Sequence, residues 1–419
     1  MKNNFSKPFL LALGLIMALM ISFQTLCHGQ SPGAIYGTIE TIDGNSYTGA
    51  LRWGKEEAFW SDMFNSQKTR NTNVKYLSKS DYEKMKGEKE EGWKWNNYSI
   101  SFIWDDEYHA TTHSFACRFG DIARIELKGR EEINLVLKNG EEIELEGGSN
   151  DIGADIQVRD REIGEISIPW NRIEVISFSE TPDNLRAHFG EALIGTVKTE
   201  RGEYTGRIQW DHDECVGEDK LDGDTRDGDV SIKFNNIAAI KKDGRGSEVT
   251  LRSGRTMYLY GSNDVNSGNR GVVINLPDLG KVKVGWDDFV SLELIWGRNS
   301  DMMGYKDFPK PEKISGTVRT TNGQTLRGEL IYDLDETWDL EMLDGSDEDT
   351  EYSIPFRNIK RIKPKNYAYT EIILKNGQKL LLGDSQDVTD KHDGVLVFTS
   401  RDSSPKYVVW DDIDEILID

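Results

Sequence analysis

The feature that most constrains the fold of this chain is a pattern that occurs three times along it. Three stretches begin with Gly-Thr-apolar, pass through a glycine turn and end in acidic sequence: Gly37–Glu56, Gly195–Asp213 and Gly316–Asp335. An aromatic-x-x-Ile-x-x-Ile phrase follows each stretch, starting at Phe119, Phe234 and Phe356. Self-similarity at this scale predicts tandem structural units.

Each copy also has a second half, which closes on a tryptophan phrase that starts at Trp170, Trp286 or Trp410. Apolar residues alternate on both sides of glycine turns such as Asn139-Gly140, and this period of two predicts half-buried antiparallel strands. Units this small hide their edges best by curling into barrels. We therefore expect an all-β chain of three tandem repeats, each made of two small antiparallel barrels. The repeats span residues 33–178, 194–295 and 314–419.

The segment Val318–Asp333 combines an apolar residue and Thr, two glycines and a final aromatic residue followed by Asp. This arrangement resembles the first motif of Sm-like barrels, and the closing aromatic-x-x-Ile-x-x-Ile phrase resembles the last turn and strand of Src-homology-3-like barrels. The resemblance implies a barrel shape for each half. The Asp-x-x-Met-Asn and Arg-Gly steps of the Sm family are absent, so its RNA binding is not implied for this chain.

The first repeat carries an insertion, at about residues 66–113, that has no counterpart in the other two. It holds a charged stretch from Asp81 that is long enough for a short helix, and the tryptophans Trp93 and Trp95. Insertions in repeat proteins often form the binding face. Trp93 and Trp95 are accordingly candidate ligand-binding residues that can stack on a sugar, and the alternative is a loop that packs its own aromatic rings.

The N-terminus has the pattern of a secretory signal peptide over residues 1–29. Lys2 and Lys7 precede an apolar run of about 15 residues, shorter than the ~20 of a membrane span, and a Cys27–Gly29 stretch follows. The sequence predicts an exported protein of the periplasm or cell surface, and its signal is of the bacterial type. An uncleaved anchor and a lipoprotein with Cys27 as the modified residue are the alternatives.

The formal net charge is −22. Such a surface repels nucleic acid and anionic membranes, so we expect no nucleic-acid partner. No second long apolar segment follows the first, and we expect no membrane span after signal cleavage. A protein or a glycan remains as the expected partner class, and the sequence leaves the oligomeric state open.

Acidic residues gather in the loop after the second strand of the second and third repeats. The candidate ligands are Asp211, Asp213, Glu214, Asp333, Asp335 and Glu336. Clustered carboxylates suit calcium, which takes six to eight oxygen ligands, although the spacing is not that of the twelve-residue calcium loop. The alternative is an Asx turn with a solvated acidic tip. A Ser-Asn-Asp corner, at Ser149, Ser262 and Ser385, is a second recurring polar feature that either caps turns or binds a ligand.

Cys117 falls on an apolar core position of the repeat, and Cys215 falls at a different position of the next one, so the sequence predicts two unpaired thiols. Spacing of four makes His109, His113 and Cys117 a candidate zinc set. No assembled catalytic motif is present, and we expect no enzyme and no resident cofactor. The predicted function is a non-catalytic exported scaffold or binding module. A calcium-supported carbohydrate-binding protein is the first alternative, and a hydrolase that uses the insertion at 66–113 is the second.

Overall fold

The structure is a computed structural model that describes residues 33–87, 113–147, 151–183, 185, 188–298, 302–400 and 404–419. The described residues form antiparallel sheets, short 3-10 turns and one α-helix, α2 (Lys79–Gly87). The all-β class predicted from the alternating pattern is therefore confirmed. We call the three repeats of the sequence segment 1 (33–178), segment 2 (194–295) and segment 3 (314–419).

Segment 1 contributes one ten-stranded sheet with the order β4-β3-β7-β6-β5-β10-β1-β2-β8-β9. Its strands are β1 (Tyr36–Thr41), β2 (Ser46–Trp53), β3 (Met63–Lys68), β4 (His113–Arg118), β5 (Ile122–Leu127), β6 (Glu132–Leu137), β7 (Glu142–Glu146), β8 (Ile156–Asp160), β9 (Gly164–Ile168) and β10 (Ile173–Phe178).

Segment 2 forms most of a second ten-stranded sheet, and its β13 and β14 pair as a separate hairpin. Its strands are β11 (Ile194–Thr199), β12 (Glu203–Trp210), β13 (Lys220–Thr225), β14 (Gly228–Lys233), β15 (Ile237–Asp243), β16 (Gly246–Leu251), β17 (Thr256–Leu259), β18 (Val272–Leu276), β19 (Gly280–Val284) and β20 (Phe289–Leu294).

Segment 3 forms an eight-stranded sheet and lends the hairpin β23-β24 to the sheet of segment 2. Its strands are β21 (Ser315–Thr320), β22 (Thr325–Ile331), β23 (Met342–Asp347), β24 (Thr350–Pro355), β25 (Ile359–Pro364), β26 (Thr370–Leu374), β27 (Lys379–Leu382), β28 (Val395–Phe398), β29 (Lys406–Val408) and β30 (Ile413–Ile418).

One order of six strands occurs in all three segments. It is β5-β10-β1-β2-β8-β9 in segment 1, β15-β20-β11-β12-β18-β19 in segment 2 and β25-β30-β21-β22-β28-β29 in segment 3. The register shift also recurs, between Glu40 and Thr41, between Lys198 and Thr199, and between Arg319 and Thr320. Equivalent sequence phrases thus occupy equivalent places in the sheets.

The expected six small barrels are not what the described strands form, because none of these sheets closes into a barrel. The reason is the last strand of each segment. In segment 1, β10 closes the second half of the sequence pattern, yet it pairs with β1 and with β5 of the first half. The two halves therefore share one open sheet.

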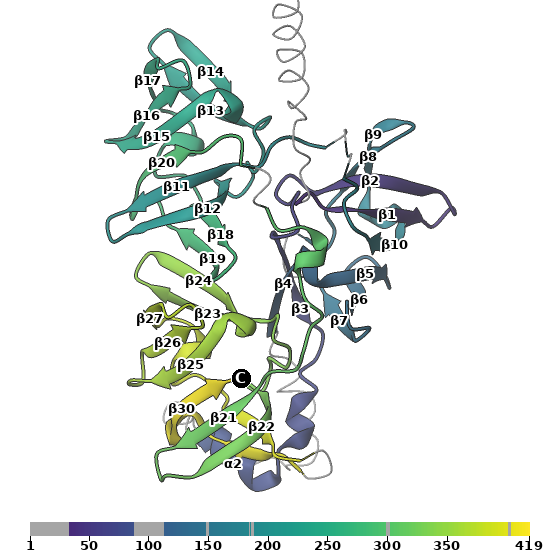
Figure 1. The fold of residues 1–419 in the computed structure, drawn as a ribbon, viewed down its shortest axis with the longest axis vertical. Helices are drawn as coiled ribbons and strands as arrows, with labels where there is room; N and C mark the ends of the chain where they lie inside the picture. The colour runs from purple at the N-terminus through teal and green to yellow at the C-terminus, as the bar shows by residue number, and fades with distance from the viewer. Residues whose placement is uncertain are drawn as a thin grey trace, which may run out of the picture.

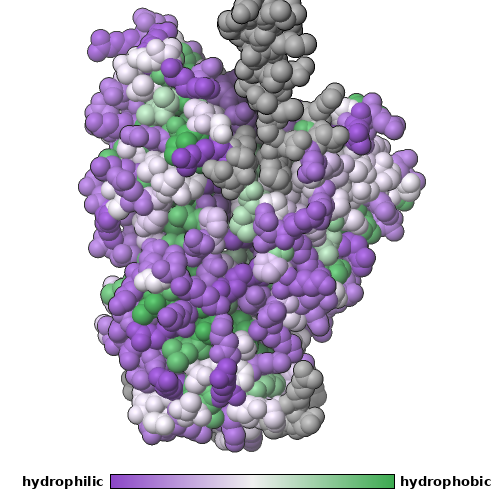
Figure 2. Space-filling view, in the orientation of Figure 1, coloured by the Kyte–Doolittle hydropathy of each residue, from purple (hydrophilic) through white to green (hydrophobic). Residues whose placement is uncertain are grey.

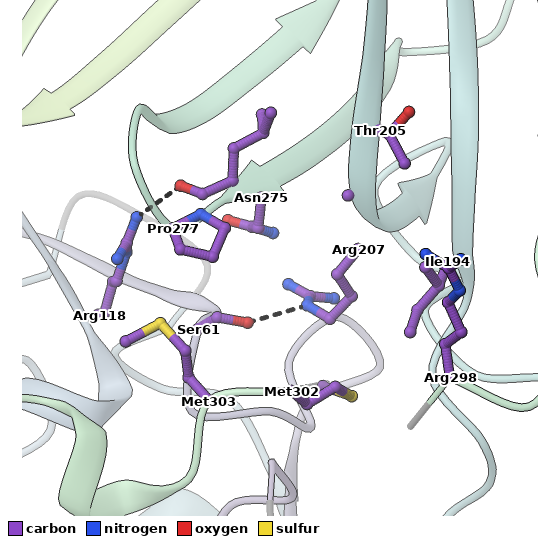
Figure 3. A pocket seen from close by; sticks show the side chains of 12 residues that line it. Ser61, Arg118, Ile194, Thr205, Arg207, Asn275, Pro277, Arg298, Met302 and Met303 are labelled. Carbon is purple, nitrogen blue, oxygen red and sulfur yellow. Dashed lines mark hydrogen bonds between the residues drawn. The ribbon is translucent and has the colours of Figure 1, made fainter. Parts of the chain in front are cut away.

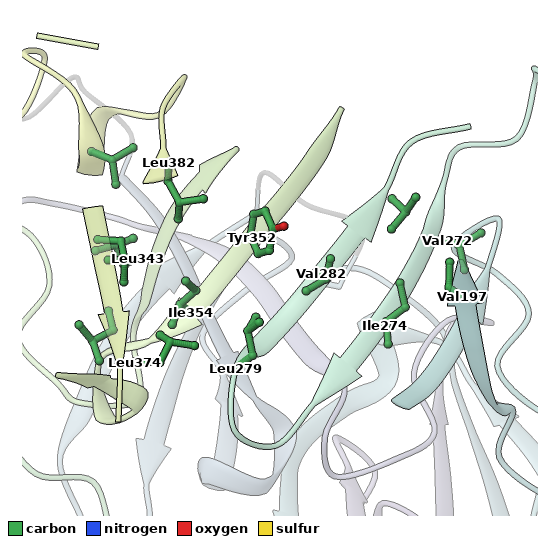
Figure 4. Close-up of a cluster of buried hydrophobic side chains, with 14 of the residues drawn as sticks. Val197, Val272, Ile274, Leu279, Val282, Leu343, Tyr352, Ile354, Leu374 and Leu382 are labelled. Atoms are coloured by element: carbon green, nitrogen blue, oxygen red, sulfur yellow. The ribbon is translucent and has the colours of Figure 1, made fainter. Parts of the chain in front are cut away.

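Segments 2 and 3 are joined by a strand pair that the local pattern does not reveal. Strand β19 pairs antiparallel with β24, so the upper and lower parts of the column in Figure 1 share one sheet. Their buried side chains also form one continuous core. Figure 4 shows Val282 of β19 beside Tyr352 and Ile354 of β24 within it.

Segment 1 lies beside this column, and the described part of its insertion packs against segment 3 (Figure 1). Tyr82 and Met85 of α2 form a buried cluster with Ile331, Leu334 and Leu396. The insertion, expected to be a binding face or a self-packed loop, thus uses its described apolar side chains to hold segments 1 and 3 together.

Candidate functional site

The acidic loops are tight turns with left-handed backbone. Asp211 and His212 have φ of 49° and 70°, and Asp333 and Leu334 have φ of 49° and 55°. The chain then returns to pair Trp210 with Glu214 and Tyr332 with Glu336. Asp tolerates this conformation better than most residues because its short side chain bonds locally, so one acid in each loop has a structural role.

The first carboxylate of each turn binds a distant backbone amide. Asp211 accepts from the N–H of Arg270 at 2.5 Å and from the side chain of Asn263. Asp333 accepts from the N–H of Asp393. Each carboxylate therefore holds the loop that follows the Ser-Asn-Asp corner, and these hydrogen bonds account for both acids without a metal.

The other acids of the two loops diverge. Asp213 faces solvent and pairs with Arg270 at 2.8 Å. Asp335 pairs with Lys68 of segment 1 at 2.9 Å and lies 3.5 Å from His113 Nδ1. The two loops belong to different segments, so the six predicted ligands form two separate groups.

Glu214 and Glu336 follow the two turns and are largely enclosed. Burial raises the pKa of Glu214 to about 9, and burial raises the pKa of Glu336 well above its ordinary value. The Oε2 atom of each is buried without a hydrogen-bond partner among the described residues. Glu214 is therefore protonated at neutral pH, a state that disfavours metal ligation, and burial shifts the pKa of Glu336 in the same direction.

Within the described ranges, no three His, Cys, Asp or Glu side chains are grouped so that they could hold a metal ion. Calcium binding by these loops stays a prediction that a titration must test.

The Ser-Asn-Asp corner lies next to the acidic turn and is part of the same network. Trp210 Nε1 donates to the backbone oxygen of Asp264 at 3.0 Å, and Tyr332 Oη donates to that of Asp387 at 2.6 Å. In segment 1, Trp53 Nε1 donates to Asp151 at 2.7 Å. The recurring aromatic residue is thus a core side chain, as predicted, and it also positions the corner.

The acids of the corner accept hydrogen bonds from backbone amides. Asp264 accepts from the N–H of Asp222 and Asp387 accepts from that of Asp344, both at 2.7 Å. Ser262 and Ser385 each accept from the amide two residues on. These contacts favour the turn-capping alternative for the corner. Ser149 lies outside the described residues.

A third set of acids, nine residues after each aromatic residue, caps the turn that follows. Asp62 accepts from the amides of residues 58 and 59, both at 2.8 Å. Asp219 accepts from those of residues 215 and 216, at 2.9 and 3.0 Å. Glu341 accepts from those of residues 337 and 338, at 2.7 and 2.8 Å. Sequence reasoning missed this role, although the equal spacing of the three was visible.

Each of these capping acids also pairs with a cation from another segment. Arg52 of segment 1 binds Asp219 of segment 2 through two contacts of 2.9 Å. Arg207 of segment 2 pairs with Asp62 of segment 1. Lys68 of segment 1 pairs with Glu341 of segment 3. The acids that shape the turns therefore also fix the segments relative to one another.

Several predicted residues lie outside the described ranges, namely Trp93, Trp95, His109, Cys27 and the segment 1–29. Cys117 and Cys215 are buried free thiols, as predicted. His113 lies beside Asp335 rather than beside a second histidine or cysteine of the described chain.

A cavity of about 190 Å³ lies where segments 1 and 2 meet the connection between segments 2 and 3 (Figure 3). Apolar side chains on its wall come from β18, the turn after it and the connection, at Leu276, Pro277, Met302 and Met303. Three arginines, Arg118, Arg207 and Arg298, also line it. Sequence reasoning missed this site, because its residues come from three separate parts of the chain.

Arg118 ends β4 and is only 6% exposed. Its Nη2 donates to the backbone oxygen of Leu276 at 3.1 Å, and its Nε has no hydrogen-bond partner among the described residues. Arg118 forms no ion pair there either, and burial lowers its pKa. Arg207 pairs with Asp62 and donates to Ser61 at 3.1 Å, while its Nη1 is buried without a described partner. The carboxylates of Asp121 and Asp278 oppose the lowering of the Arg118 pKa from a distance. The cavity thus contains a buried cation that has no direct ion pair among the described residues.

Comparison with known proteins gives no relative: no family model, no curated protein and no solved structure matches the chain. Of the helices in the described ranges, none is both long enough and apolar enough to cross a membrane.

Proposed function

We propose that this chain is an exported, non-catalytic binding module built as a scaffold of three tandem copies of one two-part unit. The shared strand order and the equivalent hydrogen bonds of the aromatic residues support a common unit. The relation of each half to Sm-like or Src-homology-3-like barrels stays a prediction about strand plan alone. Of the acids that the sequence offered for chemistry, Asp211 and Asp333 bind backbone amides and Asp335 pairs with a cation of another segment, and this favours a scaffold.

The binding site of this module is the cavity at the junction, and its ligand is a small carboxylate on an apolar body. The observation that carries this proposal is Arg118, a buried cation with an unpartnered Nε and no direct ion pair among the described residues, in a cavity with an apolar wall. Burying a charge is costly unless it is paired, so an anion that enters gains a charge-assisted hydrogen bond. At about 190 Å³ the cavity is smaller than the roughly 300–1,000 Å³ of pockets for drug-sized ligands. The ligand is accordingly small.

Calorimetric titration of the chain from residue 30 with benzoate tests this site, with benzyl alcohol as the neutral comparison and inorganic phosphate as an anion without an apolar body. Benzoate is expected to bind and the other two are not. Arg118→Gln should weaken benzoate binding by about tenfold or more, because a hydrogen bond to a charged group contributes about 1.5–3 kcal/mol.

The exposed Arg226 gives the control variant, and Arg226→Gln should bind benzoate like the original chain. Equal binding of benzoate and benzyl alcohol, or no binding of benzoate, would overturn the assignment. Should Arg118→Gln fail to fold, Met303→Trp fills the cavity instead and should abolish binding.

Export is tested separately by fusing residues 1–29 to a phosphatase that is active only outside the cytoplasm. Activity of the fusion, and its loss when the apolar run at 9–23 receives two lysines, is the expected result. An inactive fusion would contradict export and would leave the cavity proposal standing.

A further inference from the structure

Several strands end a described sheet, among them β9 in segment 1 and β14 in segment 2. Strand β9 pairs only with β8 and ends its sheet. Strand β14 pairs only with β13. Much of both strands is exposed, and Figure 1 places them on opposite sides of the upper molecule. A free edge presents unpaired N–H and C=O groups that can bind another strand.

Within the chain, one such edge, that of β19, is already paired with a strand of another segment. Strand β19 pairs with β24 with Val282 opposite Tyr352 and Lys283 opposite Glu351. Lys283 Nζ lies 3.0 Å from the carboxylate of Glu351. The hydroxyl of Tyr204, on β12, hydrogen-bonds that of Tyr352 at 2.7 Å.

The free strands are the counterparts of this pair. Strand β9 has the same place in segment 1 that β19 has in segment 2. The strand orders β2-β8-β9 and β12-β18-β19 correspond, and both β9 and β19 precede a tryptophan phrase. Strand β14 occupies in segment 2 the place of β24, since each closes a hairpin and leads into a Phe-x-x-Ile phrase. One chain therefore carries an unused copy of each partner.

The charges that flank the pair are inverted on the unused copies. Arg201, in the turn between β11 and β12, pairs with Glu348 in the hairpin turn before β24 and lies 3.6 Å from Asp288, which follows β19. In segment 1 the counterpart of Arg201 is Asp43, and that of Asp288 is Arg172. Asp43 and Arg172 pair with each other.

The hairpin turn before β14 is inverted as well. Arg226 stands where the turn before β24 has Glu348. The residue at the position of Arg201 is therefore negative in segment 1, and the residue at the position of Glu348 is positive in segment 2. The two charges next to β9 and β14 are again opposite in sign. Across an interface, such complementarity selects the partner and fixes the register.

We propose that β9 of one copy of this chain pairs antiparallel with β14 of a second copy. Ile166 then lies opposite Val230, Ser167 lies opposite Asp229, and Asp43 faces Arg226. The two edges are different surfaces, so the contact is head-to-tail and builds rings or open rows of copies. This assembly goes beyond the binding function and does not depend on the cavity.

The edge strand β29, which is the counterpart of β9 and β19 in segment 3, is the less suitable partner for β14. Lys406 takes the place of Val282 on it, and Asn322 takes the place of Arg201. It therefore offers neither the apolar side chain opposite Val230 nor a charge opposite Arg226. The charged residues Asp229 and Lys233 on β14 also discourage pairing with unrelated strands.

Directed disulfide formation between two single variants tests the pairing. One chain from residue 30 carries Ser167→Cys and the other carries Asp229→Cys. Under mild oxidation the mixture is expected to give a covalent dimer of one chain of each kind. The native thiols are buried and do not compete. Mixing Asp229→Cys with the exposed control Lys379→Cys should give no such dimer.

Absence of the mixed dimer, or dimers formed only between identical variants, would overturn the proposal. A charge exchange gives a second measurement that does not need cysteine. Asp43→Arg alone and Arg226→Asp alone should each weaken self-association in sedimentation, and the double variant should regain it. Arg245→Asp, in another hairpin turn of segment 2, should leave association unchanged.

Discussion

Arg52 of segment 1 binds Asp219 of segment 2 through two contacts of 2.9 Å. A second contact, from the equivalent position of segment 2 to segment 1, joins the same two segments. Gln209, which takes the position of Arg52 in segment 2, donates to the backbone oxygen of Glu56 at 2.7 Å. Arg52 in turn donates to the backbone oxygen of Asp213, the counterpart of Glu56, at 3.4 Å. Segments 1 and 2 therefore meet through equivalent turns, as two subunits of a symmetric dimer do.

Asp219→Asn should destabilise the whole chain. The substitution leaves Arg52 largely buried without a counter-charge, and breaking a buried pair costs about 3–5 kcal/mol. Urea unfolding should show the loss as a lower midpoint with an unchanged slope. The exposed Asp229 supplies the control, since Asp229→Asn should change the unfolding free energy by less than about 0.5 kcal/mol. A loss no larger than the control's would mean that the pair contributes nothing.

Tyr332→Phe should lower stability by about 1–3 kcal/mol, because it leaves the buried backbone oxygen of Asp387 without its donor. Tyr258 also donates to a backbone oxygen, that of Asp243, but it is 43% exposed. Water replaces the lost donor there, so Tyr258→Phe should be nearly neutral. Thermal unfolding of the two variants makes the comparison, and equal effects would show that Tyr332 does not position the corner.

The chain should lose stability as the pH rises from about 4.5 to about 9, in part because of Glu214. Burial raises the pKa of this group from 4.5 to about 9, so the folded state holds a proton that the unfolded state releases. Its stabilising contribution is complete below pH 4.5 and is lost as the pH passes the folded value. Glu214→Gln should match the original chain at pH 5 and exceed it in stability at pH 9.

Glu218→Gln is the control for this pH dependence. Its hydrogen bond to Lys233 lowers the pKa of Glu218, which is exposed, so the variant should keep the decline between pH 5 and pH 9. A decline of unchanged size in Glu214→Gln would show that Glu214 is not the group responsible.

Calcium should raise the melting temperature no more than magnesium does. Asp211 and Asp333 already bind backbone amides. Burial raises the pKa of Glu214 to about 9 and raises that of Glu336 well above its ordinary value. A larger shift with calcium that disappears in Asp213→Asn, Glu214→Gln would instead establish a calcium site in the second segment.

The sequence pattern predicted the strands, the turns and the buried aromatic residues, because these depend on local alternation and on glycine. It did not predict that β10 joins two halves into one sheet or that β19 pairs with β24, since both are contacts between distant strands. The acids illustrate the same limit. Asp211 was identified as a chemical group, but its partner, the amide of Arg270, is 59 residues away.

The cavity was missed for a related reason. Arg118 and Leu276 belong to different segments and share no motif. The fold brings these residues together and buries Arg118 without a direct ion pair among the described residues, and neither result follows from the local pattern.

The most direct test of the account is a double-mutant cycle on Arg52 and Asp219, measured by urea unfolding. Arg52→Met, Asp219→Asn and the double variant should give a coupling free energy of at least about 1 kcal/mol, because the two side chains act as one unit between the segments. A coupling within about 0.3 kcal/mol of zero would contradict the claim that turn-capping acids hold the segments together.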